Sequence, residues 1–192
     1  DFATDGTEGI SDEEESKTLI NASVLGMIFE KINGYKEGSF YTPAYITMYM
    51  CKETLRRAVV QKFKEKENED IESFENLKNY CSRFFKQEDI KKLNTVFNSL
   101  KVCDPAVGSG HFLVSALNEL IVIKHELGLL VDVKGGSLAK YDIHIENDEL
   151  YVTDEEGHLI DYKPKNTESV RVQHTLFHEK QTIIENCQCF CK

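Results

Sequence analysis

Apolar side chains in the first half of the chain recur at helical spacing. Between residues 18 and 32 they return every three or four positions, which predicts an amphipathic helix. A second helix is predicted to begin near Pro43, because proline is favoured in the first turn of a helix. Its buried side is predicted to carry Ile46, Met50, Leu55 and Val59. Since the spacing continues through residues 61–87 and 90–100, the region 17–99 is predicted to be mainly helical.

The pattern changes at residue 100. Leu100 to Asp104 is a short apolar run that stops at Pro105, which predicts a buried strand. A glycine loop follows, and then a long apolar helix from about His111 to Leu130. A strand, a tight glycine turn and a helix together are typical of the first unit of a doubly wound α/β fold.

The region 141–162 is predicted to form a β-hairpin. Residues 143–152 and 158–162 alternate between apolar and polar positions, and they flank a turn at residues 153–157 that contains glycine. Helical spacing returns over residues 174–186, which predicts a last helix.

Composition indicates one ordinary globular domain. The chain has 192 residues, 41% of them hydrophobic, and no apolar stretch approaches the roughly 20 residues that span a bilayer. Residues 1–16 hold seven acids and no base, unlike a signal peptide, and they predict a disordered leader or a piece of a preceding domain. We therefore expect a cytoplasmic protein without a membrane partner. The net charge of −10 comes mostly from this leader, so overall charge decides little about partners.

The cysteines do not predict a metal site or a disulfide framework. Cys51, Cys81 and Cys103 lie in segments predicted to be helix or buried strand, where a free cysteine acts as a small hydrophobe. Three more cysteines fall within residues 187–191, without the second pair that a zinc site needs.

The histidines are not predicted to act in catalysis or metal binding. His174 and His178 are four residues apart, but no third ligand completes a zinc signature, so we expect a solvated helix face. His111 follows the glycine loop, where a residue that starts the helix is a simpler interpretation than a catalytic base.

The glycine loop at residues 104–112 is the most informative segment. Gly108 and Gly110 permit positive φ and a close approach of the backbone to a ligand, and the amides of the following helix favour a negative group. A dinucleotide fingerprint is disfavoured because Leu113 stands where its third glycine belongs, and the Gly-Lys-Ser/Thr of a phosphate-binding loop is absent. Taken alone, the loop leaves open a tight turn that binds no ligand.

Residues 104–113, Asp-Pro-Ala-Val-Gly-Ser-Gly-His-Phe-Leu, resemble motif I of the amino-methyltransferases that act on DNA. Upstream, residues 38–43, Gly-Ser-Phe-Tyr-Thr-Pro, resemble motif X, which precedes motif I in the gamma-type order. Residues 24–30 resemble the helix that introduces motif X in large restriction–modification proteins. Over roughly residues 19–186 the chain therefore resembles the N-terminal part of a gamma-type, adenine-specific DNA methyltransferase of the large restriction–modification, type IIG-like family.

The resemblance implies an α/β fold. An incomplete Rossmann-like methyltransferase core over residues 100–192 would follow the helical region 17–99, which includes the loop 38–43, and would carry the hairpin 141–162 as an insertion. The implied cofactor is S-adenosylmethionine. The implied cofactor-binding residues are Tyr41, Thr42, Pro43, Asp104, Pro105, Ala106, Gly108, Ser109 and Gly110.

Each of these residues takes its role from the resemblance. Asp104 would lie near the methionyl ammonium or its waters, and Thr42 would hydrogen-bond the methionine carboxylate between Tyr41 and Pro43. Ala106 and Gly108 would let the backbone line the methionine moiety, and Gly110 would complete the turn into the helix. An ordinary helix start capped by threonine is the alternative for residues 41–43.

The motif that performs the chemistry in this family is absent. Methyl transfer to an adenine amino group there uses an (Asn/Asp/Ser)-Pro-Pro-aromatic motif, which orients the flipped base. The three prolines of this chain are not adjacent, so no catalytic residue is assigned. We therefore expect a fragment, inactive alone, of an enzyme that methylates adenine N6 in DNA.

Two other functions stay open at this point. The chain could belong to a methyltransferase that acts on RNA or protein, since motif I occurs beyond DNA enzymes. It could also be a non-enzymatic module, either a degenerate remnant or a helical domain used in assembly. In each case an exposed edge of an incomplete sheet is expected to favour self-association.

Overall fold

The computed structural model describes residue 28 and residues 42–67, 70–105, 107, 110–161 and 163–186. The chain divides into two units, residues 1–41 and 42–192. In the first unit only Ile28 is described, as a helical residue, so most of the helix predicted over 18–32 and the loop 38–41 lie outside the described residues. The helices and strands named below all belong to the second unit.

Helix α3 (Ala44–Glu67) begins directly after Pro43, whose carbonyl accepts hydrogen bonds from the amides of Ile46 and Thr47. The helix forms where the spacing predicts it, but its buried face is partly different. The buried side chains are Thr47, Cys51, Leu55, Val59 and Phe63. The prediction that Met50 is buried is wrong, since 45% of its surface is exposed. The buried residues recur at every fourth position from Thr47, and this repeat determines which face of α3 is buried. Its first position is occupied by threonine, a small polar residue.

The charged stretch that follows contains two short helices. Helix α4 (Phe74–Cys81) is N-capped by Ser73, whose hydroxyl oxygen accepts a hydrogen bond from the amide of Asn76. Helix α5 (Gln87–Asn98) buries Leu93 and Phe97. Both helices pack against α3, so the apolar positions of this stretch close one side of the core.

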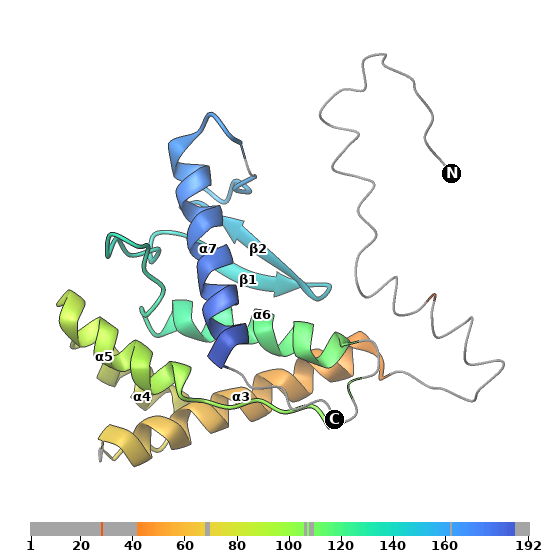
Figure 1. Cartoon of the computed structure of the whole chain (residues 1–192), viewed down its shortest axis with the longest axis vertical. Helices are drawn as coiled ribbons and strands as arrows, with labels where there is room; N and C mark the ends of the chain where they lie inside the picture. The colour runs from red at the N-terminus through yellow and green to blue at the C-terminus, as the bar shows by residue number, and fades with distance from the viewer. Residues whose placement is uncertain are drawn as a thin grey trace. The chain divides into compact units, whose positions relative to one another are not determined.

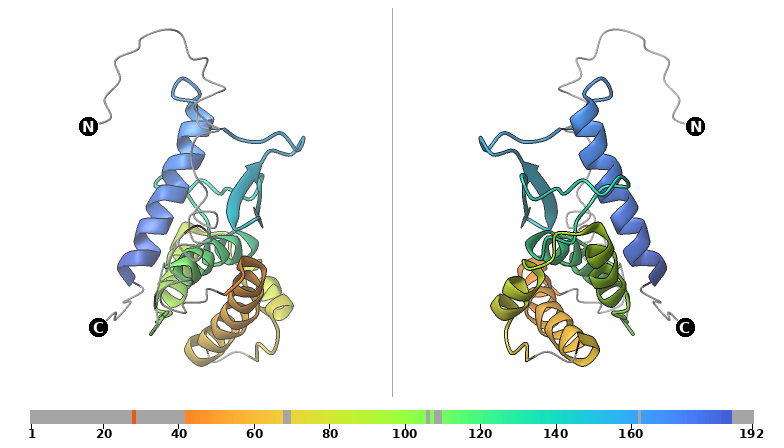
Figure 2. Two further views of the ribbon diagram at one scale, coloured as in Figure 1. Left: turned by 90° about the vertical axis from the view of Figure 1, so that its right-hand side faces the viewer. Right: turned by 90° about the vertical axis from the view of Figure 1, so that its left-hand side faces the viewer.

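Helix α6 (His111–Glu126) is the centre of the fold. It contacts α3 on one side and both α7 (Thr167–Asn186) and the hairpin on the other, as Figures 1 and 2 show. Its apolar residues are buried around most of its circumference, which explains why its sequence is apolar without a clear polar face. The helix ends at Glu126, four residues before the predicted end, because Gly128 adopts a left-handed φ of 70°.

A hairpin forms within residues 141–162, but the prediction that residues 143–152 pair with 158–162 is wrong, because the first predicted strand folds back on itself. Strands β1 (Asp142–Glu146) and β2 (Glu149–Thr153) pair antiparallel, with Ile143 opposite Val152. The turn is Asn147-Asp148, both at positive φ, whereas the prediction put it at residues 153–157. Asparagine and aspartate tolerate this conformation, and such turns match the twist of paired strands. The second predicted strand contributes only an isolated bridge between Leu159 and Thr153.

Residues 100–104, predicted as a buried strand, belong to no strand or helix in the structure. Lys101 and Cys103 are exposed, and Val102 and Asp104 are half-buried. Among the described residues the sheet has the two strands of the hairpin. The doubly wound, Rossmann-like arrangement therefore stays a prediction.

None of the helices in the described part of the chain combines the length and the apolar character that crossing a bilayer requires.

Candidate cofactor site at the helix starts

Helices α3 and α6 lie side by side and run in the same direction. Near their starts, the Cys51 thiol donates a hydrogen bond to the carbonyl of Phe112, with a sulfur–oxygen distance of 3.7 Å. Further along, Arg56 Nε donates to Glu119 Oε1 at 2.9 Å, and the same guanidinium binds Glu126 through both of its other nitrogens. Because the partners advance together along both helices, the two helix starts lie at the same end of the pair (Figure 1).

This shared end carries the described members of the predicted cofactor site. Thr42 and Pro43 precede α3 and are exposed, while Gly110 immediately precedes α6. Asp104, half-buried, and Pro105, exposed, lie a few residues before Gly110. The remaining predicted residues, Tyr41, Ala106, Gly108 and Ser109, lie outside the described residues.

Two helix starts at one end concentrate positive potential there. The amides of the first turn of a helix have no carbonyl partner within the helix, and the helix dipole adds to their partial charge. Both effects favour a negatively charged group in front of α3 and α6.

Gly110 forms the turn into α6. Its φ is 80°, and its amide donates to the carbonyl of Val107 at 2.8 Å. Its own carbonyl accepts the amides of Leu113 and Val114, which starts the helical ladder. A Cβ added to Gly110 would meet no atom of the described residues within 4 Å. Glycine is therefore needed at this position for its backbone conformation.

The tip of the hairpin lies against the first two turns of α6. Asp148 is buried, and its Oδ1 accepts a hydrogen bond from the hydroxyl of Ser115 at 2.7 Å. Its Oδ2 lies 3.2 Å from Nδ1 of His111. The backbone carbonyl of Asp148 accepts from the side-chain amide of Asn118 at 3.0 Å. Asp148 was not predicted from the sequence as a site residue. The Asn-Asp pair between two apolar runs is nevertheless a sequence signal for a tight turn.

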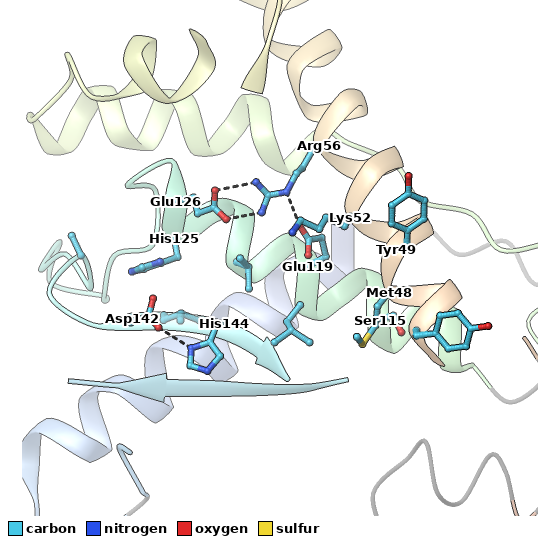
Figure 3. A pocket seen from close by; sticks show the side chains of 15 residues that line it. Met48, Tyr49, Lys52, Arg56, Ser115, Glu119, His125, Glu126, Asp142 and His144 are labelled. Atoms are coloured by element: carbon cyan, nitrogen blue, oxygen red, sulfur yellow. Dashed lines mark hydrogen bonds and ion pairs between the residues drawn. The ribbon is translucent and has the colours of Figure 1, made fainter. Parts of the chain in front are cut away.

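A groove of about 750 Å³ lies between α3, α6 and β1 (Figure 3). Its wall on α3 carries Tyr45, Tyr49 and Lys52, and β1 contributes Asp142 and His144. Arg56 bridges Glu119 and Glu126 inside the groove, as the dashed lines in Figure 3 show. None of the described cofactor residues lines this groove, although it reaches the first turn of α3 at Tyr45.

Burial and ion pairing act in opposite directions on the carboxylates between α3 and α6, and the hydrogen bonds from Arg56 leave the pKa of Glu126 lowered. Burial raises the pKa of Glu119, and the neighbouring Arg56 opposes this effect. Burial, together with the charges of Asp148 and Glu119, raises the pKa of the Cys51 thiol to about 11. Cys51 is therefore a protonated core residue at neutral pH, as the sequence predicted for a buried cysteine.

The structure also shows where the other cysteines and histidines considered from the sequence lie. Cys81 is buried, whereas Cys103 is exposed, contrary to the prediction that it lies in a buried strand. His174 and His178 are exposed on α7, the solvated face that was predicted. His111 starts α6, as predicted, and in addition lies against Asp148.

Comparison with known proteins gives one informative similarity. The chain is 35% identical, over 133 aligned residues, to a protein of Methanocaldococcus jannaschii named "Putative type II restriction enzyme and methyltransferase". The alignment covers 62% of this chain and 11% of that protein, so the chain spans about a tenth of the length of this relative. Neither a family model nor a solved structure matches the chain. The similarity supports a link to restriction–modification methyltransferases at this coarse level.

Proposed function

We propose that this chain forms part of the S-adenosylmethionine pocket of a DNA methyltransferase from a restriction–modification system. The complete protein would transfer a methyl group from this cofactor to adenine N6. The observation that carries the proposal is the parallel packing of α3 and α6. Thr42 and Pro43, which precede α3, and Gly110, which precedes α6, therefore lie at one end of the helix pair.

The chemistry of this end suits the amino-acid part of the cofactor. S-adenosylmethionine carries an ammonium and a carboxylate on adjacent atoms, so a site for it needs an acid and hydrogen-bond donors close together. Asp104 supplies a carboxylate for the ammonium. The hydroxyl of Thr42 and the amides at the two helix starts supply donors for the carboxylate. Because Gly110 has no Cβ, a ligand could lie directly against the main chain there.

The similar protein supports the reaction class. Its printed name combines a restriction enzyme and a methyltransferase, which implies DNA as the substrate of the complete protein. The choice of adenine N6 rests on the gamma-type resemblance of residues 38–43 and 104–113. Because no two prolines are adjacent in this chain, we assign it cofactor binding without methyl transfer.

Calorimetric titration of the chain with S-adenosylmethionine and with S-adenosylhomocysteine tests this function. We expect saturable binding of both. Thr42→Val removes a donor to the carboxylate and should weaken binding about tenfold, as expected for a hydrogen bond to a charged group. Asp104→Asn should weaken S-adenosylmethionine binding to a similar extent.

The matched control is Thr54→Val, an exposed threonine on α3, the helix that Thr42 precedes, whose hydroxyl donates to the carbonyl of Met50. This variant should bind like the wild type. Absence of binding by the folded wild-type chain, or equal binding of a nicotinamide dinucleotide, would contradict the proposed function.

A further inference from the structure

We infer that Asp148, at the tip of the β-hairpin, is a positioning residue for the glycine turn that leads into α6. This inference rests on the proposed function, since the glycine turn is part of the proposed cofactor pocket. Asp148 lies outside both motif-like segments and on a different element. Figure 1 shows the turn between β1 and β2 next to the start of α6.

Three contacts join Asp148 to the first half of α6. Its carboxylate lies 3.2 Å from the His111 imidazole and accepts the Ser115 hydroxyl at 2.7 Å, while its backbone carbonyl accepts the Asn118 side chain. His111, Ser115 and Asn118 are spaced four and three residues apart, so they form one stripe along α6. One buried residue therefore holds the first two turns of the helix.

Burial makes these contacts strong. Only 1% of the Asp148 side chain is exposed. A buried carboxylate that loses its partners is strongly destabilising, so the polar groups on α6 must stay close to it. The same contact also restrains His111, whose side chain is only 15% exposed.

His111 connects Asp148 to the glycine turn. It directly follows Gly110, whose amide and carbonyl close the turn to Val107 and begin the ladder of α6. Gly110 has no side chain that could fix its own position, and a glycine at φ 80° has wide conformational freedom. The side chain of the next residue, tied to the hairpin, provides that restraint.

The backbone of the turn indicates that the hairpin is built to present this side chain. Asn147 and Asp148 both have positive φ, at 51° and 66°, which ordinary residues avoid. A tight two-residue turn also keeps the side chain of Asp148 at the end of the hairpin. The hairpin region 141–162 would thus position the glycine turn of the proposed pocket.

Asp148→Asn is the appropriate test variant. Asparagine tolerates positive φ, so the turn is preserved, and it still accepts a hydrogen bond from Ser115 while it loses the charge that faces His111. Asp142→Asn is the matched control, because it makes the same chemical change on the same hairpin at an exposed residue. Ser115→Ala removes one α6 partner and provides a second variant if Asp148→Asn does not fold.

Two measurements separate positioning from general destabilisation. Amide hydrogen exchange should be about tenfold faster at Gly110, Leu113 and Val114 in Asp148→Asn, as expected for a lost interaction with a charged group. Exchange at Leu127, which bonds Ile123 at the far end of α6, should not change. Calorimetric titration should give a similar loss of S-adenosylmethionine affinity in Asp148→Asn and none in Asp142→Asn.

The outcomes distinguish the two proposals. If the wild-type chain does not bind S-adenosylmethionine, the proposed function fails, while the exchange data still decide whether Asp148 holds the turn. If exchange in Asp148→Asn is unchanged at Gly110, or faster to the same degree along all of α6, the positioning role is overturned. If the wild type binds and Asp148→Asn binds equally well, its importance for the pocket is overturned.

Discussion

At the scale of single residues, the core contains a buried charge that only tertiary packing explains. Lys124 on α6 is fully buried, and its ammonium lies 2.5 Å from the carboxylate of Glu179 on α7 and 3.3 Å from the side-chain oxygen of Asn98. Burial lowers the pKa of Lys124, and Glu179 opposes this effect. An ammonium in this position needs its partner, because leaving one member of a buried ion pair alone is strongly destabilising.

Glu179→Gln should therefore lower the free energy of unfolding by about 3 kcal/mol. The measurement is urea denaturation at neutral pH. Glu185→Gln, at an exposed position on the same helix, is the control and should change stability by less than about 0.5 kcal/mol. Equal stability of the two variants would show that Lys124 finds another partner or loses its proton.

At the scale of elements, the start of α6 depends on one backbone conformation. Gly110 has φ 80°, and Gly128 just beyond the other end of α6 has φ 70°. In both places an added Cβ would meet nothing within 4 Å, so alanine would be strained only through its backbone. The two glycines form a matched pair, since one lies at the proposed pocket and the other does not.

Gly110→Ala and Gly128→Ala should each lower the free energy of unfolding by about 1 to 2 kcal/mol, the cost of a left-handed conformation for a residue with a Cβ. If the proposed pocket is correct, only Gly110→Ala should also weaken S-adenosylmethionine binding, because it shifts the turn at that pocket. Thermal unfolding and calorimetry on the same samples provide both quantities. An equal loss of affinity in both variants would indicate a global effect.

At the scale of the whole molecule, a network of charges joins the start of α7 to the loop before the hairpin. Arg171 binds Asp132 and Glu168, each at 2.8 Å, and Lys140 binds Glu168 at 2.6 Å. Hydrogen bonds from Arg171, Lys140 and Tyr141 hold the pKa of Glu168 far below its ordinary value of 4.5. The hydrogen bond from Arg171 and that from the Gly136 amide likewise lower the pKa of Asp132.

This network should make stability fall with acid. A carboxylate whose pKa is depressed in the folded state stabilises the protein above its unfolded pKa, and the contribution is lost as pH falls towards the folded pKa. We expect the free energy of unfolding to decline progressively below about pH 4.5. Arg171→Gln should reduce this decline, measured by urea denaturation from pH 7 to pH 3. Parallel pH curves for the two proteins would exclude the network as the cause.

Local signals in the sequence were sufficient for several elements. Pro43 and the apolar repeat after it predicted α3, and the glycine loop with the apolar run after it predicted the start of α6 at His111. These signals are local because a helix start and a glycine turn depend on backbone conformation within a few residues. The candidate cofactor residues were implied by the resemblance of segments 38–43 and 104–113 to motifs X and I, which is also a feature of local sequence.

Tertiary packing decided the rest. It determined that α3 and α6 run parallel, which brings two segments about sixty residues apart to one end, and that Asp148 restrains the turn before His111. It also determined that residues 100–104 form no strand among the described residues, although their apolar pattern predicted one. Such features depend on partners far along the chain. A strand needs a neighbouring strand to pair with, and a buried charge needs an oppositely charged group. The local sequence of a segment does not show whether either partner is present.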